Sequence, residues 1–393
     1  MNSNNDPIPL TSVDGAFVHI LNKLNYMHQL FTGTKTFKDF DVNDNTTTVQ
    51  IYFSEIQLRL QILIDLINES KSKQKKPKQP KSFGDLTKPL MILTKIHSTA
   101  VTSLIELYDK RIATGFRDGS LCISYIDYFN KKCTCELQRT KAHNETITSL
   151  CELRTNELLS SSIDSTVKIW SIDLNNIKLV STLQGHSKPV RKIILIREQN
   201  AFATCSDDGC IKLWTNNLPY QDIRTYREES DISSLLKPYA RNIIIASCVK
   251  SNSLGFWNLS KHKRTDNMVN ICTNFPNGLI ELKDGIIVVG NNQMAGVVKV
   301  IDIDKKIIVK EFSEFMVGKS LSEINILKPN VFGFIYDGFT YQISDIGYEV
   351  KSAVKSEGGV QGEGGFLSSK NSQYVLIQNN ACGVTVFEYS RLK

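Results

Sequence analysis

The chain has 393 residues, of which 41% are hydrophobic and 22% charged, and this ordinary globular composition excludes a wholly disordered or collagen-like chain. The net charge of +7 is local, because setting aside the six lysines of residues 70–82 leaves +1, which argues against a broad basic surface for nucleic acid. Nine cysteines without a CxxC pair fit a reduced intracellular protein better than a disulfide scaffold or a zinc domain.

The sequence shows neither a membrane span nor a secretory signal. Its most apolar stretch, residues 56–67, is interrupted by Gln57, Arg59, Gln61 and Asp65. The first ten residues, MNSNNDPIPL, lack the basic start and the long apolar run of a signal peptide. We therefore expect a cytoplasmic protein that has no membrane partner.

Residues 1–69 are expected to form an α-helical extension with helices at about 14–31 and 46–69. The second helix carries two apolar stripes, which is more than one neighbouring helix covers. Its main stripe, the candidate assembly surface, consists of Phe53, Ile56, Leu60, Leu63 and Ile67. We expect it to pair with a second copy of the chain or with a partner helix, as in a coiled coil. A hairpin within the chain, or docking on the rest of the chain, is the alternative.

Residues 70–88 are expected to form a linker that contains lysine and proline. Its basic part, 71–81, fits a solvated spacer, and it is also compatible with a nuclear-import signal or a patch for an anionic membrane. The apolar segment PLMILTKI follows at residues 89–96 and predicts a β-strand.

Three segments then repeat one pattern: residues 112–124, 158–170 and 202–214. In each, a hydroxyl residue is followed four residues later by an aspartate and six residues after that by a fixed position, and a histidine precedes the aspartate. The sets are His97, Thr114, Asp118 and Ser124; His143, Ser160, Asp164 and Trp170; and His186, Thr204, Asp208 and Trp214.

The last position of this pattern recurs to the end of the chain at roughly 40–45-residue spacing. It continues through Trp257, Ile301, Ile343 and Phe387, which makes seven units in all. Each unit contains short runs rich in Val and Ile that are separated by turn residues, as in antiparallel strands.

The pattern resembles the WD-repeat family of β-propellers. The resemblance implies an all-β fold in which residues 89–393 form seven four-stranded blades. One strand is missing after the last unit and one is spare at 89–96, so we expect strand 89–96 to close the ring with the last blade.

By this resemblance, the histidine, hydroxyl, aspartate and tryptophan of a unit form a hydrogen-bonded set that stabilises the blade. Three copies at a fixed period argue against a Ser-His-Asp hydrolase site. The sequence offers no phosphate loop, so we expect no enzyme, no cofactor and no metal. Cys133 and Cys135 are expected to be free thiols in the first long loop between strands.

The resemblance also implies a partner-binding face, formed by the residue before each turn aspartate. Counting around the ring gives Arg117, Ile163, Asp207, Lys250, Met294, Tyr336 and Asn380. Because these residues are chemically mixed, we expect a protein or peptide partner rather than a nucleic acid.

These observations favour a non-enzymatic scaffold, whose propeller recruits a protein and whose helices mediate assembly. Two alternatives remain open: a substrate-receptor subunit of a ubiquitin ligase, and a signalling subunit that resembles the G-protein β subunit.

Overall fold

The chain divides into two compact units, Met1–Ser82 and Phe83–Lys393. The expected helices 14–31 and 46–69 and the linker 70–88 lie outside the residues that the structure describes. In this computed structural model the described residues are 89–93, 97–127, 132–173, 175–269, 271, 276–291, 298–312, 321–328, 331–336, 339–355, 366–368, 374–379 and 383–388.

The described residues form seven four-stranded antiparallel sheets, and six of these sheets each use four consecutive strands. The first three sheets contain β2 (Val101–Glu106), β3 (Ile112–Phe116), β4 (Leu121–Asp127) and β5 (Lys132–Arg139); β6 (Ile147–Arg154), β7 (Glu157–Ser162), β8 (Val167–Ile172) and β9 (Ile177–Leu183); and β10 (Val190–Ile196), β11 (Ala201–Ser206), β12 (Cys210–Thr215) and β13 (Asp222–Arg227). The next three contain β14 (Ile232–Leu236), β15 (Ile243–Cys248), β16 (Ser253–Asn258) and β17 (Lys263–Met268); β18 (Pro276–Lys283), β19 (Ile286–Asn291), β20 (Val298–Asp302) and β21 (Ile307–Phe312); and β22 (Leu321–Lys328), β23 (Val331–Tyr336), β24 (Phe339–Ser344) and β25 (Val350–Lys355).

The last sheet joins the two ends of the second unit. Its order is β1-β28-β27-β26, with β1 at Pro89–Leu93, β26 at Phe366–Ser368, β27 at Tyr374–Asn379 and β28 at Gly383–Glu388. β1 runs antiparallel to β28 and pairs Leu93 with Val384. Residues 94–96, the end of the expected strand, lie outside the described part of the chain.

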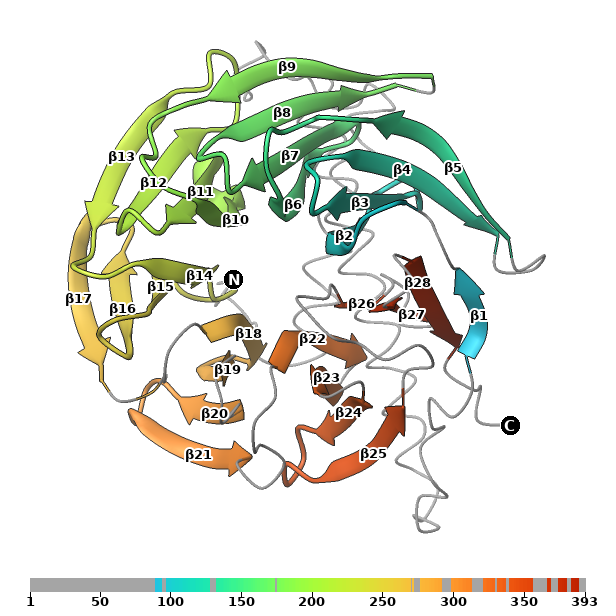
Figure 1. Cartoon of the computed structure of the whole chain (residues 1–393). Coiled ribbons are helices and arrows are strands. Elements are labelled where there is room, and N and C mark those ends of the chain that lie inside the picture. Colours follow the sequence, from blue (N-terminus) through green and yellow to red (C-terminus); the bar gives the residue numbers. More distant parts are fainter. Residues whose placement is uncertain are drawn as a thin grey trace, which may run out of the picture. The chain divides into compact units, whose positions relative to one another are not determined.

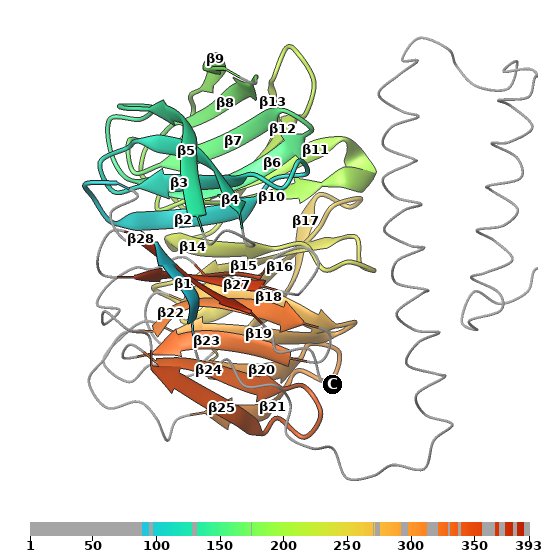
Figure 2. The ribbon, with the colours of Figure 1, turned by 90° about the vertical axis from the view of Figure 1, so that its right-hand side faces the viewer.

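The sheets are arranged in a ring around a central axis (Figure 1). The innermost strands β2, β6, β10, β14, β18 and β22 contact one another in this order, and β26 contacts both β22 and β2. Seen from the side, the strands run roughly along the ring axis, so the turns gather on two opposite faces (Figure 2). The expected all-β propeller is thus confirmed for the described residues.

In every sheet, the recurring sequence position coincides with a shift in the register of strand pairing. Between the third and fourth strands of the first six sheets, the pairing register shifts just before Ser124, Trp170, Trp214, Trp257, Ile301 and Ile343. In the sheet closed by β1, the shift falls between Val386 and Phe387. A bulge at this place bends and twists the outer part of each sheet.

The core lies between the faces of neighbouring sheets. Leu121 and Ile123 of the first sheet pack with Ile147 and Leu158 of the second in one buried cluster. Burying one such side chain contributes roughly 1.5–3 kcal/mol. Strands buried on both faces, such as β11 (AFATCS), therefore carry small or apolar side chains throughout.

Two further observations complete the fold. Cys133 and Cys135 lie within β5, so their expected placement in a loop is wrong. The segment pairs with β4 along its whole length and thereby supplies the fourth strand of the first sheet. Among the described residues, no helix has the length and apolar character needed to cross a membrane.

Candidate functional site

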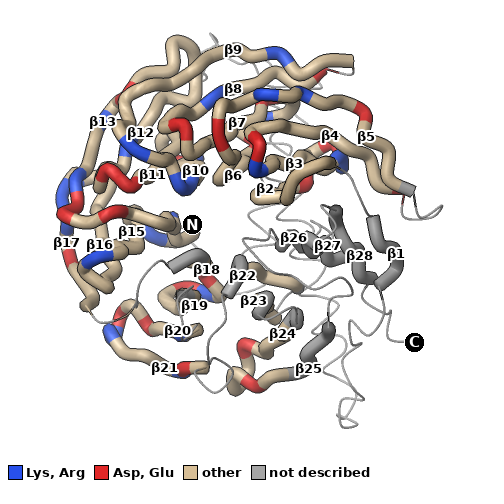
Figure 3. The backbone as a smooth tube through the Cα atoms, in the orientation of Figure 1, with Lys and Arg blue, Asp and Glu red and all other residues tan. Residues whose placement is uncertain are grey.

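The ring presents two faces that differ in their loops. The turns between second and third strands, such as β11–β12, lie on one face with the connections between sheets; we call it the Asp207 face. The turns between first and second and between third and fourth strands lie on the other, which we call the Tyr239 face after the residue between β14 and β15. Among the described residues, Lys, Arg, Asp and Glu are interspersed around the ring (Figure 3).

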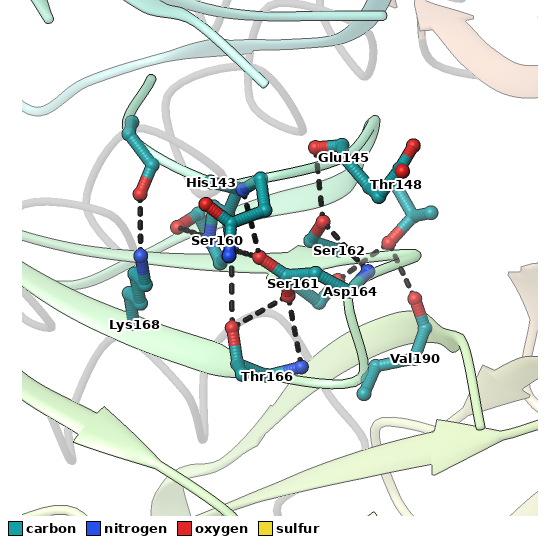
Figure 4. A network of polar contacts seen from close by, with 12 residues as sticks. His143, Glu145, Thr148, Ser160, Ser161, Ser162, Asp164, Thr166, Lys168 and Val190 are labelled. Atoms are coloured by element: carbon teal, nitrogen blue, oxygen red, sulfur yellow. Dashed lines mark hydrogen bonds and ion pairs between the residues drawn. The ribbon is translucent and has the colours of Figure 1, made fainter. Parts of the chain in front are cut away.

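In the second sheet, the predicted residues form one chain of hydrogen bonds, of which Figure 4 shows His143, Ser160 and Asp164. The indole N–H of Trp170 donates to Ser160 Oγ at 2.8 Å, and Ser160 Oγ lies 2.7 Å from His143 Nε2. The other ring nitrogen, Nδ1, lies 3.0 Å from Asp164 Oδ2. Every group is satisfied if Ser160 donates to Nε2 and Nδ1–H donates to the carboxylate, so the network assigns this neutral tautomer to His143.

Burial and hydrogen bonding set the charges in this network. Burial lowers the pKa of His143 below its usual value, and the contact with Asp164 opposes this shift without cancelling it. Burial alone would raise the pKa of Asp164, but hydrogen bonds from His143, Thr166 and the Asn144 N–H outweigh it and hold that pKa below its usual range. The structure therefore holds a neutral imidazole against an ionised carboxylate.

The third sheet repeats this arrangement. His186 lies 2.9 Å from Asp208 Oδ2 and 2.8 Å from Thr204 Oγ1, which also accepts the indole N–H of Trp214 at 2.9 Å. The pKa of Asp208 is likewise held below its usual range, because the hydrogen bonds from His186 and two backbone N–H groups exceed the opposing effect of burial.

The first sheet has a looser set. His97 Nδ1 lies 3.8 Å from Asp118 Oδ2, and the ring stacks on Phe116 at 4.2 Å between centroids. Thr114 is buried in β3. Because Ser124 takes the place of the tryptophan, no indole is present to anchor the hydroxyl.

In the second and third sheets, solvent does not reach the hydroxyl groups of these sets. His143, Ser160 and Thr204 each have 0% of their surface exposed, so no substrate could approach the hydroxyl groups. Within the described part of the chain, no group of three His, Cys, Asp or Glu side chains is placed to hold a metal ion. The hydrogen bonds of the second and third sets are made within their own sheets.

Three of the predicted partner-binding residues occupy equivalent places in their sheets, a placement that the structure shows for none of the other four. The backbone N–H groups of Arg117, Ile163 and Asp207 donate to Ala100, Thr146 and Pro189, just ahead of β2, β6 and β10. The same bond in the fourth sheet is made by Val249, so Lys250 lies one residue past the equivalent place. Tyr336 is the last residue of β23, while Met294 and Asn380 lie outside the described residues.

Two of the predicted residues are engaged within the ring. Arg191 makes a bidentate ion pair with Asp207, at 2.8 Å to Oδ1 and 2.5 Å to Oδ2, and the Asp207 side chain is only 15% exposed. Lys250 Nζ lies 3.3 Å from Asp231 Oδ1. A partner on the Asp207 face would have to compete with these pairs or bind beside them.

The fourth sheet contains a polar centre that the sequence analysis missed. It lacks the histidine and the aspartate, and Trp257 instead donates its indole N–H to Glu228 Oε1 at 2.6 Å. Arg264 lies 3.0 Å from Glu228 Oε2, whose side chain is only 4% exposed. Glu228 lies in the connection before β14 and takes the place of the usual hydroxyl. The one sequence signal for it is Trp257, a tryptophan at the recurring position in a unit that lacks the histidine and the aspartate.

The Tyr239 face carries exposed apolar and aromatic side chains that the sequence analysis also missed. Four large side chains protrude from its loops, with Tyr239 exposed by 79%. They are Tyr108 after β2, Leu218 after β12, Tyr239 after β14 and Ile346 after β24. Among the described loop residues of the Asp207 face, only Val269 is a comparably exposed large apolar residue.

Comparisons with known proteins agree with this architecture. Residues 132–171 and 177–215 match the family model described as "WD domain, G-beta repeat". The structure is similar to the solved WD40 β-propeller domain of Doa1, with a TM-score of 0.63 and 14% sequence identity, over 77% of this chain and 97% of that domain. No protein in the curated collection matches the sequence. At this identity, the likeness to the solved domain concerns the fold alone.

Proposed function

The chain belongs to the WD40-repeat family of β-propellers, and on this premise we propose that it is a non-enzymatic scaffold that recruits a protein or peptide partner. Propellers of this family are typically non-catalytic and generally serve protein interactions. The buried, mutually satisfied polar sets of the second and third sheets support this assignment, because they leave no accessible nucleophile at these positions.

The observation that carries the proposal is the row of fixed loops on the Tyr239 face. The Tyr239 N–H donates to Glu281 of the next sheet at 2.6 Å, which holds the loop while the phenol ring projects into solvent. Tyr108 has the same arrangement with Glu152 of the second sheet, at 2.8 Å. A loop whose backbone is already held loses less entropy on binding, and tyrosine is enriched among the residues that dominate interface energies.

Two further contacts link the loops of this face. Arg197 Nη2 donates to the hydroxyl of Tyr108 at 2.8 Å and so links the loops of the first and third sheets. Lys237 and Glu198 join the third and fourth sheets at 3.1 Å. We therefore place the principal partner surface on the Tyr239 face. The predicted set on the Asp207 face is the competing surface.

The proposal includes the finer architecture. We infer a ring of seven blades closed by β1, supported by the β1–β28 pairing and by the contact of β26 with β2. We further propose that residues 46–69 form an assembly helix that binds a second copy of the chain or a helical partner. This part rests on the apolar spacing of the sequence alone.

Site-specific photocrosslinking in the full-length chain tests which face binds. We expect a photoreactive phenylalanine analogue at Tyr239 to give a discrete adduct in native cells, and the same analogue at the exposed Lys250 to give none. The Tyr239→Ala chain should recover at least about tenfold less of that partner, as for an interface residue worth about 1.4 kcal/mol or more.

The possible results distinguish binding on the Tyr239 face from binding on the Asp207 face. Because the Tyr239 side chain is exposed, Tyr239→Ala should leave the unfolding midpoint unchanged, which distinguishes lost binding from lost folding. Adducts at Lys250 but not at Tyr239 would move the surface to the Asp207 face. If neither position gives an adduct, the propeller is not the recruiting part of the chain.

A further inference from the structure

We propose that the open edge of β21 (Ile307–Phe312) is a second docking site, which takes up an extended peptide whose apolar residues lie between two acidic ones. β21 is the terminal strand of the fifth sheet and runs along the outer circumference of the ring (Figure 1). No described strand pairs with its outer edge. Such an edge can accept one more strand through main-chain hydrogen bonds.

β21 carries a run of exposed apolar side chains. Five of its six residues are exposed, and they include Ile307 at 49%, Ile308 at 40% and Val309 at 41%. In β13 and β17, which are the fourth strands of the third and fourth sheets, every exposed residue except Ile223 is polar or charged. β9 exposes two apolar residues in a row. Edge strands are usually protected by charges, so three consecutive exposed β-branched residues mark a site for pairing.

Two lysines bracket this apolar run. Lys306 precedes it, pairs with Asp266 of β17 and still has 53% of its side chain exposed. Lys310 follows it and lies over the ring of the last residue of β21, with Nζ 5.7 Å from the centroid. Among the described residues, no carboxylate forms an ion pair with Lys310, because Glu311 lies 3.7 Å from Lys299 instead. The exposed run therefore has a cation at each end.

The charges favour an acidic peptide over a second copy of the chain. In the register that sets Ile308 opposite Ile308 and Ile307 opposite Val309, the apolar residues of two copies of β21 face one another. In that register, Lys306 of each copy lies opposite Lys310 of the other copy. Like charges directly opposite one another destabilise a strand pair, whereas opposite charges stabilise it. The edge therefore fits a segment in which one acidic residue stands on each side of three apolar residues.

This site is separate from the Tyr239 face. β21 forms the outer edge of the fifth sheet, whereas Tyr239 lies in the loop between β14 and β15 of the fourth. The inference goes beyond the proposed function, and it stands or fails without regard to which partner the Tyr239 face binds.

The test measures binding of a fluorescein-labelled synthetic peptide to the full-length chain by fluorescence anisotropy. The peptide has the core Glu-Val-Ile-Val-Glu with serine and glycine on both sides. We expect saturable binding that weakens at least about tenfold in Lys310→Glu and in Ile308→Lys. The matched control is Ile223→Lys, which changes an exposed isoleucine of β13 and should bind as the unaltered chain does. Tyr239→Ala should also bind unchanged.

Backbone methylation of the peptide distinguishes strand addition from a loose apolar contact. In an antiparallel pair, alternate residues of a strand exchange hydrogen bonds with the neighbouring strand. Methylating the peptide nitrogens of one alternate set should therefore prevent binding, and methylating the other set should preserve it. Hydrogen exchange should slow in β21 when the unmethylated peptide is bound, and it should stay unchanged in β13.

Four results would overturn the proposal. The first is no saturable binding at peptide concentrations up to about 1 mM. The second is equal binding of the two methylated peptides, and the third is equal binding of a peptide with lysines in place of the glutamates. The fourth is self-association of the unaltered chain that Ile308→Lys removes, because this assigns the edge to a second copy. The substituted side chains are exposed, so each variant should keep the unfolding midpoint, which separates lost binding from lost folding.

Discussion

At the scale of single residues, the ring is organised by buried side chains that satisfy one another. His143 accepts from Ser160 and donates to Asp164, so neither the imidazole nor the carboxylate is buried without a partner. The arrangement requires a neutral ring, since a protonated Nε2 could no longer accept the serine hydroxyl. The stability of the second blade is therefore tied to pH.

Acid should weaken the propeller in two stages. The lowered pKa of His143 means that below about pH 6.5, the ordinary histidine value, the unfolded chain binds a proton that the folded chain resists. The free energy of unfolding then falls as pH decreases, by at most about 1.4 kcal/mol per pH unit for one group. Asp164 and Asp208 add a second loss below about pH 4, because their folded pKa values lie below the unfolded value.

Urea unfolding at pH 7.5 and pH 5.5 measures the first stage. The His143→Gln chain, which carries no titrating ring at this position, should lose less stability between the two pH values than the unaltered chain. An identical loss in both chains would show that His143 is not the group responsible.

At the scale of elements, the second, third and fourth sheets each give the indole of the recurring tryptophan a polar partner, and this partner comes from different parts of the chain. In the second and third sheets it is a hydroxyl on the neighbouring strand, whereas in the fourth it is Glu228 from the connection before β14. Glu228 fills the space over Gly255, where a Cβ would come within 2.3 Å of its carboxylate. The glycine in β16 is thus what admits this substitute.

Removing Glu228 should destabilise the fourth sheet. Glu228→Ala leaves the indole N–H of Trp257 and the guanidinium of Arg264 without this acceptor, and we expect a loss of about 2–3 kcal/mol. Glu228→Gln keeps an acceptor for the indole and should lose about half as much. Chemical unfolding followed by tryptophan fluorescence measures both variants. The neighbouring, exposed Glu229→Ala is the control, expected within about 0.5 kcal/mol of the unaltered chain. A similar small loss for Glu228→Ala would refute the role of Glu228.

At the scale of the whole ring, closure depends on pairing across the largest sequence separation in the unit. β1 pairs with β28 through four residue pairs, from Pro89 with Phe387 to Leu93 with Val384. Without β1, the backbone of β28 would be an open edge that attracts other strands. The short segment before the first full sheet therefore contributes to the stability of the last.

Two shortened chains test closure. A chain that begins at Phe83 retains β1 and should unfold close to the full-length midpoint, because residues 83–393 are one compact unit. A chain that begins at His97 removes β1 and should unfold at least about 5 °C lower, as for a loss of about 2 kcal/mol, and should self-associate. Thermal unfolding and size-exclusion chromatography provide the readouts. Equal midpoints without association would contradict closure by β1.

The sequence by itself determined the propeller and the anchors of its second and third sheets. Both depend on residues that recur at a fixed period, because each blade has the same strand arrangement and packs through residues that are close in the sequence. The recurring position, at Trp170, Trp214, Trp257, Ile301 and Ile343, marked the repeating units, and the structure shows a register shift at the same place in each of those sheets.

Only the tertiary structure decided which side chains meet across sheets and strands. Glu228 reaches Trp257 from 29 residues away, and Cys135 lies opposite Ser124 because β5 is a strand rather than the expected loop. The exposure of Tyr239 depends on a loop held by Glu281 of the next sheet. Each of these contacts occurs once in the chain and depends on how the elements are placed. It therefore produces no repeating pattern that the sequence could reveal.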